Sequence, residues 1–170
     1  MPSTKFFFWN INNKPLTATI AALVVEHAVD VLILAESIIS DGVLVQALNS
    51  GPRSDFHLAP NPLGRMRIFT RFSRQFFQAK FESKWTTIAR IALPARDEIL
   101  LCAVHFPSKL HLTDASQAQE ASILASEIVR EEDNAGHQRT LLVGDLNMNP
   151  FEHGVVALWG FTRSCPVKSH

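Results

Sequence analysis

The chain has 170 residues, of which 46% are hydrophobic and 19% are charged. This length and apolar content exclude a disordered chain and predict a single domain over residues 1–170. The sixteen basic and sixteen acidic residues cancel, so the net charge alone gives no sign of a nucleic-acid partner.

The cysteines and the N-terminal residues indicate the cellular compartment in which the protein is expected. Cys102 and Cys165 form neither a disulfide framework nor a metal-binding spacing, so we expect a reducing, cytoplasmic compartment. The apolar run at residues 6–8 follows a single lysine and is too short for a signal peptide or a membrane span. We therefore expect no membrane partner, and the sequence indicates no oligomeric state.

The first part of the chain predicts two buried strands, at residues 5–11 and 31–36, joined by a helix over about 15–27. This order implies parallel neighbours, which would place Asn10 and Glu36 at the same carboxyl edge of a sheet. Taken singly, Asn10 is equally plausible as a turn residue and Glu36 as a capping or surface carboxylate. Their coincidence on one edge favours a site.

The middle of the chain is basic. After a short helix at 41–49, residues 55–93 predict successive antiparallel strands. From Arg53 to Arg90 there are only two acidic residues, Asp55 and Glu82, against eight basic ones: Arg53, Arg65, Arg67, Arg71, Arg74, Lys80, Lys84 and Arg90. Because acidic residues dominate 114–133, we expect a basic side and an acidic side. Most of these arginines would lie on a solvated sheet face, and one or two near the active edge would hold phosphate.

The second half repeats the pattern of an apolar strand that ends in a polar residue. A turn at 94–98 leads into a strand that ends at His105, and a long helix over 114–133 precedes a buried strand. A lone histidine in an apolar setting is usually a core residue, but its place at the strand end favours a functional role.

Asp145 and Asn147 follow the apolar run 141–143 and point to the same side of an extended chain. The alternative is a polar turn that caps a helix starting near Pro150.

These strand ends suggest one kind of chemistry. Carboxylate and carboxamide oxygens suit Mg²⁺ or Mn²⁺, whereas the absence of clustered cysteines and of a paired-histidine motif argues against zinc. Asp145 would orient or deprotonate an attacking water that Asn147 holds, and His105 would hydrogen-bond a phosphate oxygen.

Four motifs resemble those of the endonuclease/exonuclease/phosphatase superfamily, which includes apurinic endonucleases, pancreatic-type deoxyribonucleases, neutral sphingomyelinases and inositol-phosphate phosphatases. They are Trp9-Asn10-Ile11-Asn12, Leu34-Ala35-Glu36, Val104-His105-Phe106-Pro107 and Gly144-Asp145-Leu146-Asn147, in the family's order over residues 5 to about 151. The resemblance implies an α/β fold, a four-layer α/β sandwich. It also implies that Glu36 is a metal ligand assisted by Asn10, that Asp145 and Asn147 serve the nucleophilic water, and that His105 contacts the scissile phosphate.

Two departures from the family pattern stand out. The family normally ends with a Ser-Asp-His-like segment, but here only twenty-three residues follow Asn147, and the final His170 has no aspartate before it. We therefore expect a truncated or naturally shortened domain, with His170 as the candidate for the missing histidine. The chain also has no tyrosine, so any family role of a central tyrosine is vacant.

The leading hypothesis is a magnesium-dependent phosphodiesterase, a nuclease with nucleic acid as its substrate, because the strand region is basic. A phosphomonoesterase or a phospholipid phosphodiesterase on the same scaffold is the second reading. A catalytically inactive module that binds nucleic acid or protein is the third.

Overall fold

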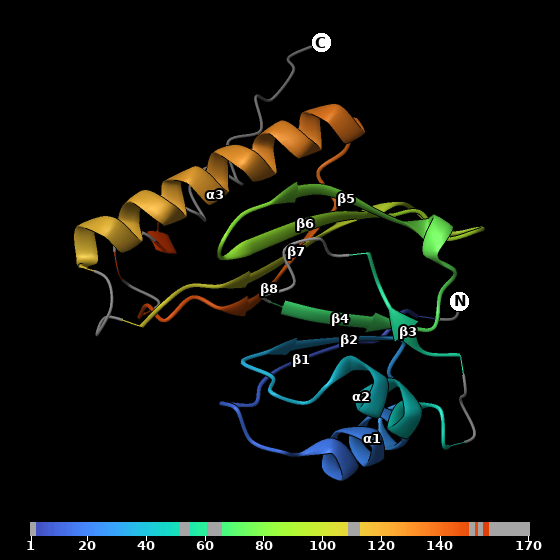
Figure 1. Cartoon of the computed structure of the whole chain (residues 1–170). Coiled ribbons are helices and arrows are strands. Elements are labelled where there is room, and N and C mark those ends of the chain that lie inside the picture. Colours follow the sequence, from blue (N-terminus) through green and yellow to red (C-terminus); the bar gives the residue numbers. More distant parts are fainter. Residues whose placement is uncertain are drawn as a thin grey trace.

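The computed structural model describes residues 3–51, 55–60, 66–108, 113–149, 152 and 155–156. Two sheets pack face to face, with helices on both outer faces, so the predicted four-layer α/β sandwich is confirmed (Figure 1). The helices are α1 (Thr17–Glu26), α2 (Asp41–Leu48), α3 (Asp114–Ala135) and the short 3₁₀ helix η1 (Arg74–Phe76). Helices α1 and α2 cover the first sheet, and α3 covers the second.

The first sheet has the strand order β1-β2-β4-β3 in the described part of the chain. Its strands are β1 (Phe6–Asn10), β2 (Val31–Ala35), β3 (His57–Leu58) and β4 (Met66–Thr70). Strands β1 and β2 are parallel, as predicted, because α1 crosses over between them. Strand β4 is antiparallel to both β2 and β3.

The second sheet has the order β5-β6-β7-β8. Its strands are β5 (Phe77–Glu82), β6 (Thr86–Ile91), β7 (Ile99–His105) and β8 (Thr140–Asp145). Strands β5, β6 and β7 form an antiparallel meander, and β8 returns parallel to β7 after α3. Both sheets thus contain one parallel pair joined through a helix.

Strand β2 is buried on both of its faces, between the helices and the second sheet. All five of its residues are buried. Because side chains alternate along a strand, Leu32 and Leu34 pack under α1 and α2, while Val31 and Ile33 face the second sheet. A third apolar cluster lies between the second sheet and α3.

The segment 55–93 differs from the expected run of successive antiparallel strands. Its strands do pair antiparallel as β3–β4 and β5–β6, but β4 pairs with β2 in the first sheet, and β5 begins the second sheet. The chain changes sheets through residues 71–76, where Phe72 packs into the core between the sheets and η1 turns the backbone. The amphipathic pattern of each strand does not reveal which sheet it joins.

Several features expected from the sequence lie outside the described residues, namely Arg53, Arg65, Cys165, His170 and the start of a helix near Pro150. Among the described residues, no helix is both long and apolar enough to cross a bilayer. Cys102 is a free thiol buried in β7, and its burial raises its pKa.

Candidate active site

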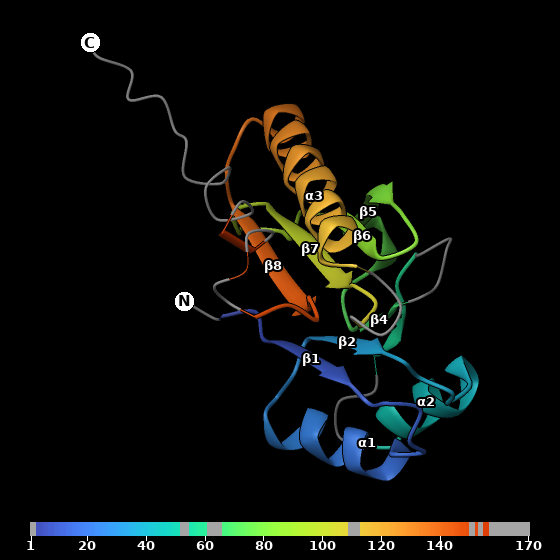
Figure 2. The ribbon, with the colours of Figure 1, turned by 90° about the vertical axis from the view of Figure 1, so that its left-hand side faces the viewer.

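The carboxyl ends of the two parallel strand pairs meet at one edge of the molecule (Figure 2). Strand β1, at the edge of the first sheet, contacts β8, at the edge of the second. Asn10 is the last residue of β1, and Glu36 directly follows β2. His105 and Asp145 end β7 and β8 and are direct partners in the parallel ladder. The two sheets therefore each bring two polar residues to this edge, which we call the rim.

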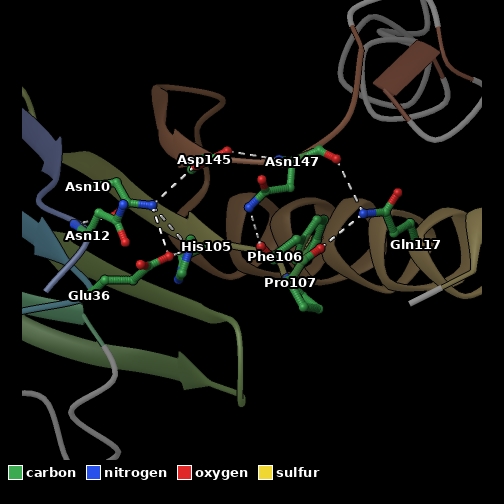
Figure 3. A network of polar contacts seen from close by, with 9 residues as sticks. All are labelled: Asn10, Asn12, Glu36, His105, Phe106, Pro107, Gln117, Asp145 and Asn147. Atoms are coloured by element: carbon green, nitrogen blue, oxygen red, sulfur yellow. Dashed lines mark hydrogen bonds and ion pairs between the residues drawn. The ribbon is translucent and has the colours of Figure 1, made fainter. Parts of the chain in front are cut away.

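The rim side chains form a network centred on the carboxamide of Asn10 (Figure 3). Its Nδ2 atom lies 3.1 Å from Oε1 of Glu36 and 3.3 Å from Oδ2 of Asp145. The same nitrogen lies 3.5 Å from Nε2 of His105, which in turn lies 3.0 Å from Oε1 of Glu36. Asn10, Glu36, His105 and Asp145, which the sequence placed at four separate strand ends, thus come together.

The Asn10 carboxamide has a defined orientation. Its Oδ1 accepts a hydrogen bond of 3.0 Å from the backbone N–H of Asn12, so Nδ2 must face the two carboxylates. Asn10 therefore presents a donor to Glu36 and Asp145, which suits the expected assisting role. Direct coordination of a metal through Oδ1 would require that oxygen to take a second partner beside the Asn12 N–H.

Glu36 sits in a strained turn. Its φ is 49°, in the left-handed region that disfavours residues with a Cβ atom. Its carbonyl accepts a hydrogen bond of 2.8 Å from the N–H of Asn13, which is itself left-handed with φ of 55°. The loop after β1 therefore holds the loop after β2 and fixes the Glu36 backbone.

Gly144 permits the close pairing of β7 and β8. Its φ is 150°, and a Cβ atom built at this position would lie 1.8 Å from the carbonyl oxygen of Val104. Only glycine fits this position without a shift of the backbone. Beside this strand end lies a pocket of about 550 Å³, lined by Phe8, Gly144, Asp145, Leu146, Asn147, Met148 and Asn149.

Asn147 differs from the expectation of an extended chain. Its φ is 50°, so it does not continue the alternation of β8 beside Asp145. Instead, Oδ1 of Asp145 accepts the backbone N–H of Asn147 at 2.9 Å, as in the polar-turn alternative. Nδ2 of Asn147 donates to the carbonyl of Phe106 at 2.7 Å. One carboxylate oxygen of Asp145 thus shapes the turn while the other faces Asn10.

One participant was missed in the sequence. Gln117, near the start of α3, is 1% exposed, and its Nε2 donates to the carbonyls of Pro107 and Asn147 (Figure 3). A polar residue on the same helix face as Ala121 and Leu124 was the available signal, because a buried glutamine needs hydrogen-bond partners.

The donor set of the rim fits a hard cation with few protein ligands. No group of three or more His, Cys, Asp or Glu side chains in the described ranges is arranged to hold a metal. However, Glu36 and Asp145 direct carboxylate oxygens at one amide nitrogen, and two like charges so close favour a cation between them. Mg²⁺ is commonly held by one or two carboxylates, with water and substrate phosphates as the remaining ligands. Glu36 would be such a ligand, with the Asn10 carboxamide holding its carboxylate.

The fold is shared with solved structures of low sequence identity. An endonuclease/exonuclease/phosphatase family protein from Bacteroides thetaiotaomicron matches with a TM-score of 0.65 and 14% identity, and the match covers 94% of this chain and 67% of that one. TDP2 from C. elegans matches with a TM-score of 0.60 and 16% identity, covering 89% of this chain. The endonuclease domain of the retrotransposon TRAS1 matches with a TM-score of 0.56 and 14% identity, covering 94% of this chain and 71% of that domain.

The chain spans about half of the TDP2 structure that it matches, 51% of its length. A comparison with curated protein sequences found no match. The sequence model of the Endonuclease/Exonuclease/phosphatase family matches residues 7–166, which include all five rim and loop residues predicted from the sequence. The chain therefore belongs to the Endonuclease/Exonuclease/phosphatase family.

Proposed function

We propose that this protein hydrolyses phosphodiester bonds with the help of a divalent cation, Mg²⁺ or Mn²⁺, and that its substrate is nucleic acid. Membership of a family of phosphate-ester hydrolases supports the general reaction. The observation that carries the proposal is the shared contact of Asn10 Nδ2 with carboxylates from both sheets, Glu36 and Asp145. The two carboxylates thus concentrate negative charge beside His105, which suits the binding of a divalent cation that assists phosphoryl chemistry.

Asp145 and Asn147 are the residues that would serve the attacking water. Oδ1 of Asp145 is held by the N–H of Asn147, so its Oδ2 is the oxygen available to orient the water and accept its proton. Nδ2 of Asn147 donates a hydrogen bond to the Phe106 carbonyl, and Oδ1 of the same carboxamide can accept a hydrogen bond from the attacking water.

His105 would act on the phosphate. A carboxylate only accepts hydrogen bonds, so Nε2 of His105 donates to Glu36 in the present arrangement. A phosphate oxygen entering the rim can take this N–H, and the donor then stabilises the charge that develops on that oxygen. A divalent cation held at Glu36 would neutralise the phosphoryl charge and the charge on the leaving oxygen.

The basic strand region supports a polyanionic substrate only in part. Arg67, Arg71 and Arg90 each pair with a carboxylate, which lowers the positive charge that they offer. Lys84 is placed differently: it is exposed in the turn between β5 and β6, with Nζ 4.5 Å from the centre of the Trp85 ring. The Trp85 carbonyl accepts the N–H of His105 at 2.8 Å, so the turn that carries Lys84 lies beside the end of β7. The TRAS1 domain, described as an endonuclease, is consistent with such a substrate.

The test is cleavage of plasmid, single-stranded DNA and RNA with added Mg²⁺ or Mn²⁺ and with a chelator. We expect metal-dependent cleavage by the natural chain and a loss of about 100-fold or more in Glu36→Ala and Asp145→Ala. Glu26→Ala, which removes an exposed carboxylate of α1, is the matched control and should retain full activity. Equal activity in all four proteins would contradict the proposal. Phosphate release from small esters without nicking of plasmid would replace the nuclease with a phosphomonoesterase.

A further inference from the structure

The buried carboxamide of Gln117 joins the two loops that carry the rim residues. Its Nε2 lies 3.0 Å from the carbonyl oxygen of Pro107, in the loop after β7, and 3.3 Å from that of Asn147, in the loop after β8. Both partners are acceptors, so the NH₂ group must face them and the orientation of the carboxamide is determined. The carboxamide nitrogen therefore donates one hydrogen bond to each loop.

The helix that carries Gln117 is firmly anchored at this point. Thr113 caps α3 by accepting the N–H of Ser116 at 3.2 Å, and the backbone N–H of Gln117 donates to the Thr113 carbonyl at 3.0 Å. Gln117 is 1% exposed, and the helix packs on the second sheet through Ala121 and Leu124. The side chain therefore has a fixed base from which to hold the loops.

The two loops also bind each other directly, through two hydrogen bonds. The N–H of Phe106 donates to the Asp145 carbonyl at 2.9 Å, and Nδ2 of Asn147 donates to the Phe106 carbonyl. The Asn147 carbonyl accepts its hydrogen bond from Gln117, and this bond helps to hold the chain in the turn that the left-handed φ of 50° at Asn147 creates. The turn of Asn147 thus depends on a residue from a third element (Figure 3).

The unpaired side-chain oxygen of Gln117 lowers the stability of the fold, which indicates that this residue has a role beyond packing. Oε1 of Gln117 is buried and has no hydrogen-bond partner among the described residues. A leucine or methionine at this position would fill similar space on the apolar face of α3 without burying an unpaired oxygen. A glutamine here gains only the two contacts to the loops.

We propose that Gln117 is a positioning residue, which sets the place of the Asn147 backbone and so the aim of Asn147 Oδ1 and Asp145 Oδ2 at the attacking water. The inference rests on the proposed function. Because Gln117 is 1% exposed and contacts the loops through their carbonyls, its loss should lower the rate of the chemical step and leave substrate binding nearly intact. A misplacement of about 1 Å costs about 100-fold in rate.

The experiment compares the natural chain with Gln117→Leu, Gln117→Met and Leu124→Ala. Leu124 is buried in the same helix, so its truncation loosens the packing of α3 without removing the loop contacts. Each protein is assayed at saturating Mg²⁺ on a labelled oligonucleotide, well below its Tm. We expect both Gln117 variants to lose about 10- to 100-fold in kcat with KM changed less than about twofold. Leu124→Ala should lower Tm and keep kcat within about twofold.

A second readout does not depend on turnover. In protein labelled with ¹⁵N-asparagine, the side-chain NH₂ of Asn147, assigned with Asn147→Asp, should exchange slowly in the natural chain and in Leu124→Ala. It should exchange faster in Gln117→Leu. If no substrate is cleaved by any protein, the proposed function fails, and the exchange data still decide the positioning role. Unchanged exchange and unchanged kcat in Gln117→Leu, or an equal loss of kcat in Leu124→Ala, would overturn the inference.

Discussion

Asn10 and Asp145 lie 135 residues apart in the chain and belong to different sheets, yet Nδ2 of the first lies 3.3 Å from Oδ2 of the second. This contact closes the rim between β1 and β8. It also makes Asn10 the residue that orients both carboxylates, because the same nitrogen donates to Glu36.

Replacement of Asn10 should therefore impair metal use rather than the fold. Asn10→Ala removes the donor that holds both carboxylates, and such outer contacts of metal ligands are typically worth about 10- to 100-fold in affinity or activity. We expect the Mg²⁺ concentration for half-maximal cleavage to rise within that range. Asn10→Asp should be worse, because it adds a third negative charge. A metal titration of the cleavage rate measures both effects, and an unchanged titration curve would refute the orienting role.

Lys84 should contribute to binding of a polyanion. With Asp145→Asn as a cleavage-impaired background, Lys84→Ala should weaken binding of labelled single-stranded DNA. Loss of one phosphate contact lowers the slope of log affinity against log salt by about 0.7. Lys80→Ala is the control, because Lys80 borders a pocket with Asn134 and Ala135 at the far end of α3. Equal slopes for the two variants, measured by fluorescence anisotropy, would remove Lys84 from the substrate path.

Gly144→Ala should destabilise the protein strongly. The new Cβ would meet the Val104 carbonyl at 1.8 Å, and backbone must move to relieve this contact. We expect a loss of about 3 kcal/mol or more in the free energy of unfolding in urea. Gly42→Ala is the matched control: it lies in α2 with no atom within 4 Å of the added Cβ. It should stabilise the protein by about 0.5 kcal/mol, because alanine suits a helix better than glycine.

The lowered pKa of Glu98 predicts that the stability of the protein depends on pH. Burial alone raises the pKa of Glu98, but hydrogen bonds from Arg90, at 2.5 Å, and His137, at 3.1 Å, outweigh it and hold the pKa below 4.5. A carboxyl whose pKa is lowered by folding stabilises the protein above its unfolded pKa. That stability is lost as the pH falls through the lower, folded pKa.

The measurement compares the natural chain with Glu98→Gln in urea at about pH 7 and at about pH 3. We expect the natural chain to be more stable at neutral pH and the difference to shrink as the pH falls below 4.5. Glu26→Gln, which changes an exposed carboxylate, should show little difference at either pH. A stability difference for Glu98→Gln that is independent of pH would contradict the sign argued here.

Local patterns were sufficient for the strand ends. The apolar runs before Asn10, Glu36, His105 and Asp145 each predicted a buried strand, because a strand covered on both faces needs continuous apolar residues. This prediction is confirmed for β2 and β7, whereas β1 and β8, which end the strand orders of their sheets, are mostly half-buried. The parallel pairing of β1 with β2 followed from the helix between them. The roles of these residues in catalysis stay predictions until the variants are assayed.

Other features depended on contacts that no local pattern encodes. The sequence of 55–93 showed strands but not that β4 and β5 belong to different sheets, since each strand has an apolar face that either sheet can bury. The sequence left the polar turn at Asn147 as an alternative to the extended chain, and the structure has the turn. The link through Gln117 was missed, because its partners are backbone carbonyls of loops distant in the chain.

The sequence by itself thus determined which apolar segments are strands, which polar residues end them, and the family to which these motifs belong. The tertiary structure decided that the ends of two separate sheets meet at one rim, and how Asn10, Gln117 and Asn147 are turned there. The physical reason is that hydrophobic periodicity is a property of single elements, whereas the packing of two sheets and the direction of a hydrogen bond depend on residues far apart in the chain.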